Sequence, residues 1–177
     1  MQILRAADRI ATPWKNGGGV TREVVAWPPG AGMDDFDWRV SLADVAADGP
    51  FSAFPGVDRV LTVIEGDGLV LEVEGRAAHL KPGAPFAFPG EAAVAARLTG
   101  GPIRDLNVMV RRGVWTARVA PWRGAPVVNI DGPTLVVLLQ DVEDFAAQDV
   151  VLFDARETVT LDFPSETRAL TIALGAI

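Results

Sequence analysis

Residues 58–89, DRVLTVIEGDGLVLEVEGRAAHLKPGAPFAFP, decide the fold class of this chain. An apolar, β-branched run over residues 60–65 stops at a Gly-Asp-Gly turn, and residues 69–74 then alternate apolar and acidic side chains. Residues 77–80 lead into a Lys-Pro-Gly turn, where proline favours the first corner and glycine tolerates a positive φ at the next. Short strands joined by tight turns about every ten residues are typical of an antiparallel sandwich or barrel.

The same pattern continues on both sides of this stretch. Further strands are expected over residues 1–5, 20–27, 36–45, 92–98, 103–110, 115–119, 127–130, 134–139, 150–153, 157–162 and 168–174. Residues 8–12 read as a loop or a single helical turn. We therefore predict an all-β chain of mostly antiparallel strands with little helix. The two halves look like two β modules, residues 1–112 and 113–177, packed as a single compact unit.

Composition excludes several classes of function. The chain has 177 residues, of which 49% are hydrophobic, so it can bury a sizeable core. Its net charge of −7 divides into −4 over residues 1–110 and −3 over residues 111–177. Because neither half is basic, attraction to phosphate backbones or to anionic membranes has no electrostatic driving force. Nucleic acid and membranes are therefore not expected as partners.

Two amino acids are scarce, and this limits the chemistry further. Cysteine is absent, which excludes disulfides, thiolate metal ligands and cysteine nucleophiles. His79 is the sole histidine, so a multi-histidine metal site is excluded, and without a G-x-S-x-G elbow a serine triad is not expected. We expect no metal, no cofactor and no catalytic residue. The N-terminal residues lack a continuous apolar run, and no stretch of 18 apolar residues occurs, so we expect a cytoplasmic location.

Two of the predicted strands carry polar side chains among apolar ones. In residues 36–45, Arg39 and Ser41 point to one face, opposite Trp38; in residues 103–110, Asp105 and Asn107 share a face. These side chains could mark the solvent-facing side of a half-buried sheet. In a barrel, the same alternation would instead place them in a small polar cavity, where Arg39 could bind a carboxylate through two hydrogen bonds.

Two loops can also be interpreted either as purely structural or as part of a ligand-binding site. The glycine-rich segment 13–19, PWKNGGG, could be a plain turn, or its glycines could let a ligand approach the backbone near Lys15 and Asn16. It is not a Walker loop, because no Gly-Lys-Ser/Thr ending or helix follows it. The segment 51–56, FSAFPG, could line the mouth of a pocket or attach a loop to the core.

Three separated runs resemble one known family. They are PWKNGGGVTRE (13–23), FDWRVSLADVAADGPFSAFPGVDRVLTVIEGDG (36–68) and GPIRDLNVMVRRG (101–113), which occur in order with compatible spacing. They are similar to the HutD/Ves family of bacterial proteins associated with histidine utilisation. The chain beyond about Trp115 resembles the family only in its β character.

The resemblance implies a double-barrel cupin-type (bicupin) jelly roll that lacks the usual metal histidines. It implies a non-catalytic sensor or regulator that binds a small carboxylate such as formylglutamate or urocanate. Carried over by motif match, the candidate ligand-binding residues are Lys15, Asn16, Arg22, Trp38, Arg39, Ser41, Phe51, Ser52, Phe54, Arg59, Asp105 and Asn107.

Two other classes of function stay open at this point. The chain could be a metal-free enzyme acting on a small acid or sugar, with Lys15 or Asp105 as the general base. It could also be an interaction module that presents strand edges and aromatic patches to a partner or to a second copy, as in a homodimer. The interaction module predicts that Arg39, Ser41, Asp105 and Asn107 are exposed.

Overall fold

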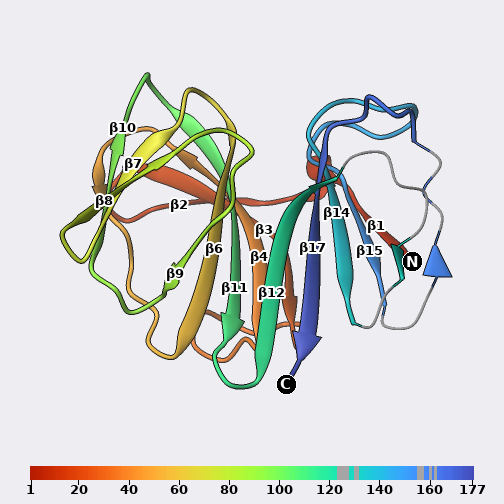
Figure 1. Cartoon of the computed structure of the whole chain (residues 1–177), viewed down its shortest axis with the longest axis horizontal. Helices are drawn as coiled ribbons and strands as arrows, with labels where there is room; N and C mark the ends of the chain where they lie inside the picture. The colour runs from red at the N-terminus through yellow and green to blue at the C-terminus, as the bar shows by residue number, and fades with distance from the viewer. Residues whose placement is uncertain (123–127, 130–131, 155–157, 160, 162) are drawn as a thin grey trace. The chain divides into compact units, whose positions relative to one another are not determined.

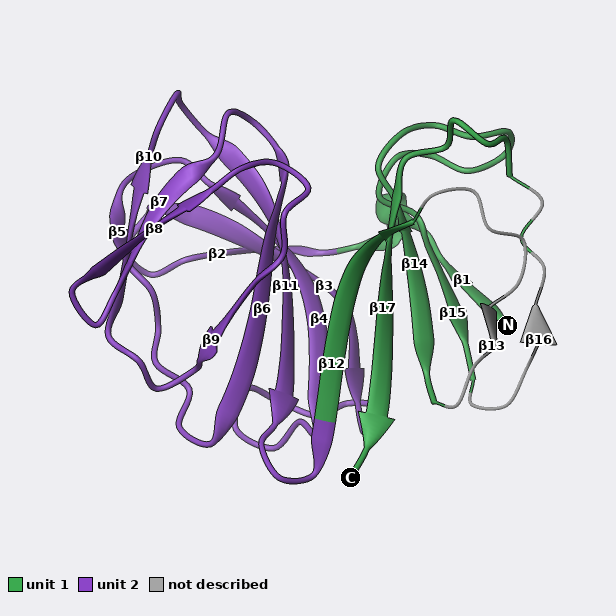
Figure 2. Ribbon diagram, in the orientation of Figure 1, with its two compact units in different colours: residues 1–9, 116–177 green, residues 10–115 purple. Residues whose placement is uncertain are grey.

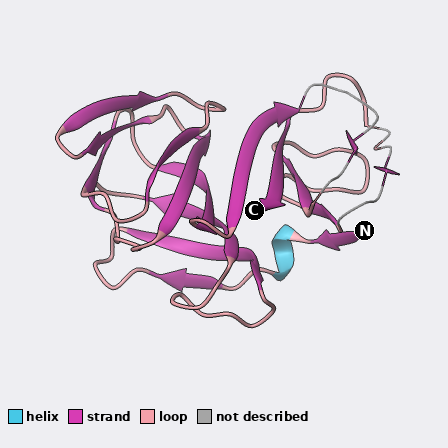
Figure 3. Ribbon diagram, turned by 60° about the horizontal axis from the view of Figure 1, so that its bottom comes forward, coloured by secondary structure: helices cyan, strands magenta, loops and turns pink. Residues whose placement is uncertain are grey.

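Strands form nearly all of the regular structure of the described residues, as the ribbon in Figure 3 shows. The computed structural model describes residues 1–122, 128–129, 132–154, 158–159, 161 and 163–177. A single short 3-10 helix, η1 (Ala6–Asp8), occurs in this part of the chain. The prediction of an all-β chain with mostly antiparallel strands and little helix is therefore confirmed.

The strands follow one another along the chain as Figure 1 labels them. They are β1 (Gln2–Leu4), β2 (Ala11–Pro13), β3 (Gly19–Trp27), β4 (Trp38–Val45), β5 (Gly49–Pro50), β6 (Val57–Glu65), β7 (Leu69–Val73), β8 (Arg76–Leu80), β9 (Phe86–Pro89), β10 (Val94–Leu98), β11 (Ile103–Arg111), β12 (Trp115–Trp122), β13 (Val128–Asn129), β14 (Thr134–Leu138), β15 (Val150–Phe153), β16 (Thr158–Val159) and β17 (Ala169–Ala176). The predicted strands 127–130 and 157–162 lie partly outside the described residues. The described strands within them, β13 and β16, pair with each other antiparallel.

The chain divides into two compact units, which Figure 2 colours separately. Unit 2 contains residues 10–115, and unit 1 contains residues 1–9 together with residues 116–177. The expected division at residue 112 assigns residues 1–9 to the first module. In the structure they belong to unit 1 instead, because β1 pairs with β15 near the other end of the chain. An isolated three-residue strand carries no long-range information in its sequence, so its partner could not be read from the alternation pattern.

Unit 2 is built from two sheets with a shared core. The larger sheet has the order β2-β3-β4-β11-β6-β9, and the smaller has the order β5-β10-β7-β8. One cluster of buried apolar side chains contains Leu61 and Val63 of the larger sheet and Leu69 and Leu71 of the smaller sheet. The two sheets therefore face each other, and the face that carries Leu61 and Val63 is the inner face of the larger sheet.

Unit 1 contains a five-stranded sheet with the order β1-β15-β14-β17-β12. Its core includes Val136, Val151 and Phe153. Around this core, the ring of Phe163 packs edge-on against both Trp122 and Phe145. The described core cluster of this unit is thus formed by aliphatic and aromatic side chains.

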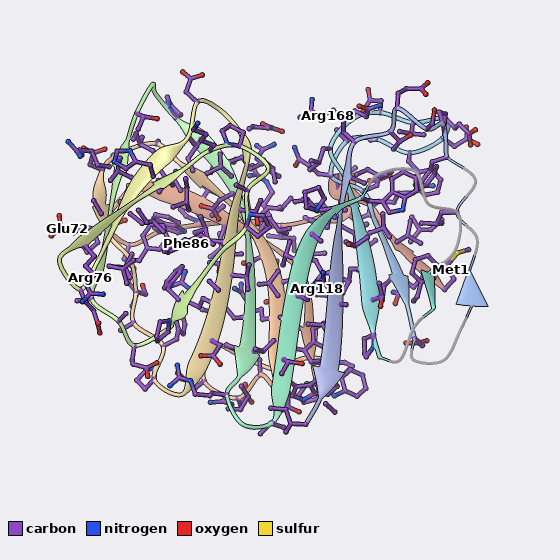
Figure 4. All side chains as sticks on the ribbon, in the orientation of Figure 1. Met1, Glu72, Arg76, Phe86, Arg118 and Arg168 are labelled. Carbon is purple, nitrogen blue, oxygen red and sulfur yellow. The ribbon has the colours of Figure 1, made fainter. Side chains whose placement is uncertain are left out.

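The hairpin that the opening stretch predicts is confirmed. Strands β7 and β8 pair antiparallel from Leu69 opposite Leu80 to Val73 opposite Arg76. The side chains of Glu72 and Arg76 extend outward from this hairpin (Figure 4). Gly75 in the turn has φ +78°, as a tight hairpin turn requires.

Gly68, just before β7, is a position where a side chain would not fit. It has φ +112°, and a Cβ atom there would collide with the backbone carbonyl of Leu80. We expect Gly68→Ala to lower the free energy of unfolding by about 2–3 kcal/mol, through backbone strain plus this collision. Urea unfolding measures the change.

Gly75→Ala is the matched control for Gly68→Ala. Gly75 also has a positive φ, but a Cβ atom there meets no other atom within 4 Å. This variant should therefore lose only the cost of the backbone conformation, about 1 kcal/mol. Equal losses in the two variants would contradict the steric argument.

Candidate functional site

The inner face of the larger sheet carries a group of polar side chains from three adjacent strands. In the register of β4, β11 and β6, Ser41 lies opposite Asn107, and Asn107 lies opposite Leu61. In the next row of the same face, Met109 lies between Arg39 and Arg59. Residues directly opposite each other in antiparallel strands point to the same side of the sheet. The polar group therefore shares the inner face with the apolar core residue Leu61.

Asp105 lies one row further along this face. It is opposite Ala43 of β4 and opposite Val63 of β6. Arg39, Ser41, Arg59 and Asp105 are all buried, and Asn107 is half-buried. Charged side chains are almost never fully buried unless they are paired. We call Arg39, Ser41, Arg59, Asp105 and Asn107 the inner-face polar cluster.

Arg39 is held by two side chains. Its Nε donates a hydrogen bond to Glu23 Oε2 at 2.8 Å, and one terminal nitrogen donates to the Ser41 hydroxyl at 3.2 Å. Glu23 lies on β3 directly opposite Ser41, which explains how it reaches the guanidinium. The Arg39 charge is thus neutralised by a carboxylate of the neighbouring strand.

Arg59 has a different environment, because it is surrounded by aromatic rings. Its guanidinium carbon lies 5.4 Å from the ring centres of Phe51 and of Phe54, and 5.0 Å from that of Phe88. One terminal nitrogen donates to the backbone carbonyl of Ser52 at 3.1 Å. Within residues 10–115, all of which the structure describes, no carboxylate forms an ion pair with it. Burial lowers the pKa of Arg59 to about 10, so it still carries its charge at neutral pH.

Several polar atoms of the cluster have no hydrogen-bond partner among the described residues. They are Arg59 Nε, Asp105 Oδ1 and Asn107 Oδ1. Leaving a buried donor or acceptor unpaired costs about 1–3 kcal/mol each, so such atoms usually have a partner that is not part of the chain. The cluster offers one unused donor and two unused acceptors.

The Asp105 carboxyl is the group whose ionisation is most perturbed. Burial raises the pKa of Asp105 to about 7, because the nearby positive charge of Arg59 only partly offsets the loss of water. The charge of Asp44 raises this pKa further. Near neutral pH, Asp105 can therefore either hold a proton or carry a charge.

The remaining predicted site residues lie in three places: around Arg59, in the turn before β3, and on the opposite face of the larger sheet. Phe51 and Phe54 contact the Arg59 guanidinium, whereas Ser52 contributes its backbone carbonyl and its side chain is exposed. Lys15 and Asn16 are exposed in the turn before β3, where Asn16 Oδ1 accepts a hydrogen bond from the Gly18 amide at 3.0 Å. The structure therefore places these two side chains in solvent rather than among the buried polar groups.

Arg22 and Trp38 lie on the opposite face of the larger sheet from Arg39. Arg22 pairs with Asp44, which also accepts a hydrogen bond from Arg104. Trp38 stacks on Trp27, with 6.4 Å between the ring centres. These two predicted residues are thus separated from the inner-face polar cluster by the sheet itself.

Three residues near the cluster were not among the predicted site residues. Glu23 binds Arg39, Phe88 contacts Arg59, and Met109 lies between the two arginines. Met109 could have been found, since the alternation places it on one face with Asp105 and Asn107. Phe88 and Glu23 depend on strand register, which a single sequence does not reveal. Phe86, labelled in Figure 4, lies two residues before Phe88 and packs against the unit 2 core.

The described residues contain no group of three or more His, Cys, Asp or Glu side chains that could hold a metal ion. The sole histidine, His79, is exposed on β8. In the same described part of the chain, no helix has the length and apolar character needed to cross a membrane.

Comparisons with known proteins agree on one family. The HutD family model matches residues 6–172. A Pseudomonas putida relative, described as an uncharacterized 21.2 kDa protein in the hutC 3' region, is 45% identical over 138 residues, which cover 77% of this chain and 72% of the relative.

Two solved structures are similar over nearly the whole chain. HutD from Pseudomonas fluorescens SBW25, in a formate condition, has 35% sequence identity and a TM-score of 0.85, covering 99% of this chain and 98% of that protein. A conserved protein of unknown function from Pseudomonas aeruginosa PAO1 has 30% identity and a TM-score of 0.86, covering 98% of this chain and 97% of that one.

Proposed function

The chain belongs to the HutD family, and on this premise we propose that it is a non-catalytic binding protein for a small carboxylate in histidine utilisation. The family is linked to the histidine utilisation locus and has a cupin-type fold; the double-barrel detail stays a prediction. Formylglutamate and urocanate are the proposed ligands, and a sensor or regulator is the proposed role. The inner-face polar cluster is the proposed binding site.

The environment of Arg59 is the main observation in support of this proposal. It is a buried cation with an unused donor, and within residues 10–115 no carboxylate pairs with it. Burying an unpaired charge is costly, so its retention in an apolar setting supports an anionic partner from outside the chain. A planar carboxylate matches the fork of donors on a guanidinium. The three phenylalanine rings around Arg59 would shield that ion pair from water.

The rest of the cluster complements a ligand with more than one polar group. Asp105 and Asn107 each present an oxygen without a donor, and Ser41, opposite Asn107, accepts a hydrogen bond from Arg39. An N–H group on the ligand would satisfy such an acceptor. Formylglutamate and urocanate each have both a carboxylate and an N–H group.

Binding of carboxylates is the first expectation to test. In calorimetric titrations, we expect formate, formylglutamate and urocanate to bind, whereas formamide, which has nearly the shape of formate but no charge, does not. We expect Arg39→Ala to weaken the affinity for formylglutamate by about ten- to a hundredfold, since a charged hydrogen bond at a buried site is lost.

Arg104→Ala is the matched control, because Arg104 forms its ion pairs on the opposite face of the same sheet. This variant should bind the carboxylates as the unmodified protein does. Failure of every carboxylate to bind, or equal binding of formate and formamide, would contradict the proposal.

One observation favours a second candidate, a metal-free enzyme acting on a small acid. The pKa of Asp105, about 7, suits a general base at neutral pH. Turnover of formylglutamate or urocanate that Asp105→Asn abolishes would favour this candidate. Binding without turnover, followed by chromatography of the recovered ligand, would favour the binding protein.

The interaction module is supported less well than either candidate. It required Arg39, Ser41, Asp105 and Asn107 to be exposed, and three of them are buried while Asn107 is half-buried.

A further inference from the structure

Glu23 contacts the inner-face polar cluster from a half-exposed position. Its side chain is 49% exposed, whereas the side chain of its partner Arg39 is 9% exposed. About half of the Glu23 side chain is therefore in contact with water, although one oxygen reaches a buried guanidinium at 2.8 Å. The position of Glu23 is where the buried cluster meets solvent.

The bond between Glu23 and Arg39 uses only part of what a guanidinium can offer. A carboxylate can bind arginine through two parallel hydrogen bonds, but Glu23 accepts one, from Nε, while a terminal nitrogen of Arg39 binds Ser41. The β3–β4 register also shifts directly after Glu23, between Glu23 and Val25. Such an irregularity bends a strand locally and is common near functional sites.

Replacing Glu23 by another carboxylate would cost the protein little. Arg39 would keep a negative partner, so no buried charge would be left unpaired. Glu23 would move from half-exposed to fully solvated, which restores water to its carboxylate. A neutral molecule could not make this exchange, because it would leave the Arg39 charge without a counter-ion.

We propose that Glu23 is an internal competitor of the ligand, whose carboxylate occupies Arg39 until the carboxylate of an incoming acid displaces it. This inference rests on the proposed function, since it concerns the same site. It makes Glu23 a specificity-determining residue: a ligand must carry a carboxylate to take its place. It also means that the unmodified protein binds acids more weakly than its arginines alone would allow.

Glu23→Gln tests this inference, because glutamine keeps the shape of the side chain and removes its charge. We expect the variant to bind formylglutamate, which has two carboxylates, about tenfold more tightly, since the ligand no longer displaces a charged group from Arg39. If Glu23 instead holds Arg39 in place for the ligand, the variant binds more weakly. Calorimetric titration separates the two outcomes by the sign of the change.

Glu65→Gln is the matched control. Glu65 is also half-exposed and also pairs with an arginine, Arg104, but on the opposite face of the sheet. We expect its affinity for formylglutamate to stay unchanged. Circular dichroism and thermal unfolding of both variants check that the fold is retained.

Each outcome has a distinct meaning. Binding to the unmodified protein with equal or weaker binding to Glu23→Gln overturns this inference and leaves the proposed function standing. Tightening in both Glu23→Gln and Glu65→Gln overturns it too, because the effect would then come from net charge alone. Absence of binding in all three proteins overturns the proposed function, and this inference with it.

Discussion

Arg59→Met is expected to weaken carboxylate binding strongly and to leave the folded protein as stable as before, or more stable. Methionine fills much of the space between Phe51, Phe54 and Phe88 and makes favourable contacts with aromatic rings. Replacing buried ion pairs with apolar side chains of similar size is often neutral or stabilising by about 1–4 kcal/mol, and a buried charge without a pair has less favourable interaction to lose. The affinity for formylglutamate should fall about a hundredfold or more, because the proposed buried ion pair is lost.

The opposite signs of the two effects make this variant informative. Titration calorimetry measures the affinity, and urea unfolding without ligand measures the stability. Arg97→Met is the control, because Arg97 is exposed on β10 and neither quantity should change. A protein that loses both stability and binding would show that Arg59 supports the fold, which would remove the main argument for an anionic ligand.

Asp105→Asn is expected to change how stability depends on pH. The pKa of Asp105 is about 7 in the folded protein and close to its ordinary value of 3.8 when the chain is unfolded. Between these values the folded state holds a proton that the unfolded state has released. The contribution of Asp105 is therefore fully present below pH 3.8 and is lost as the pH rises through 7.

The expected size of this loss is about 2–3 kcal/mol between pH 5 and pH 8. Asparagine cannot ionise and resembles the protonated acid, so the variant should become more stable relative to the unmodified protein over that range. Urea unfolding of both proteins at several pH values gives the difference. An identical pH dependence in the two would show that Asp105 is ionised throughout.

Subtracting the free energies of unfolding of the two proteins also removes the contributions of other titrating groups. At Asp44 burial tends to raise the pKa, but hydrogen bonds from Arg104 and Arg22 outweigh it and the pKa is lowered. Asp149 in unit 1 also has a lowered pKa: burial acts against the shift, and bonds from the Ala6 amide and Arg5 produce it. Both groups favour stability above their unfolded pKa and lose it in acid, the reverse of Asp105. Since both proteins contain them, they cancel.

The charges of Arg59 and Asp105 interact, so Arg59→Met should also change the pKa of Asp105. The Arg59 charge lowers the pKa of Asp105, so its removal should raise that pKa above 7. The shift would be seen as a pH dependence of stability that extends to higher pH in Arg59→Met.

Alternation along single strands predicted the faces of the site well. Arg39 with Ser41, and Asp105 with Asn107, do share faces, because side chains in a strand alternate whatever its neighbours are. The same rule placed Trp38 opposite Arg39, so alternation alone argued against including it with the cluster. The family motifs contain Trp38 and Arg22 without distinguishing one face from the other.

Strand register was the part that the sequence could not supply. Arg59 belongs to the cluster because β6 pairs with β11 so that Arg59 lies opposite Met109, and its cage is completed by Phe88 of β9. A shift of one residue would turn every one of these side chains to the other face. Between strands far apart in the chain, such as β6 and β11, buried contacts fix the register, and these contacts depend on residues that are distant in sequence.

The pairing of β1 with β15 has a consequence for how the protein is made. Gln2–Leu4 leave the ribosome long before their partner strand, Val150–Phe153, has been synthesised. Unit 2, by contrast, is one uninterrupted segment and can fold while translation continues. Unit 1 cannot complete its sheet in this way, because β1 stays without its partner until β15 has been synthesised.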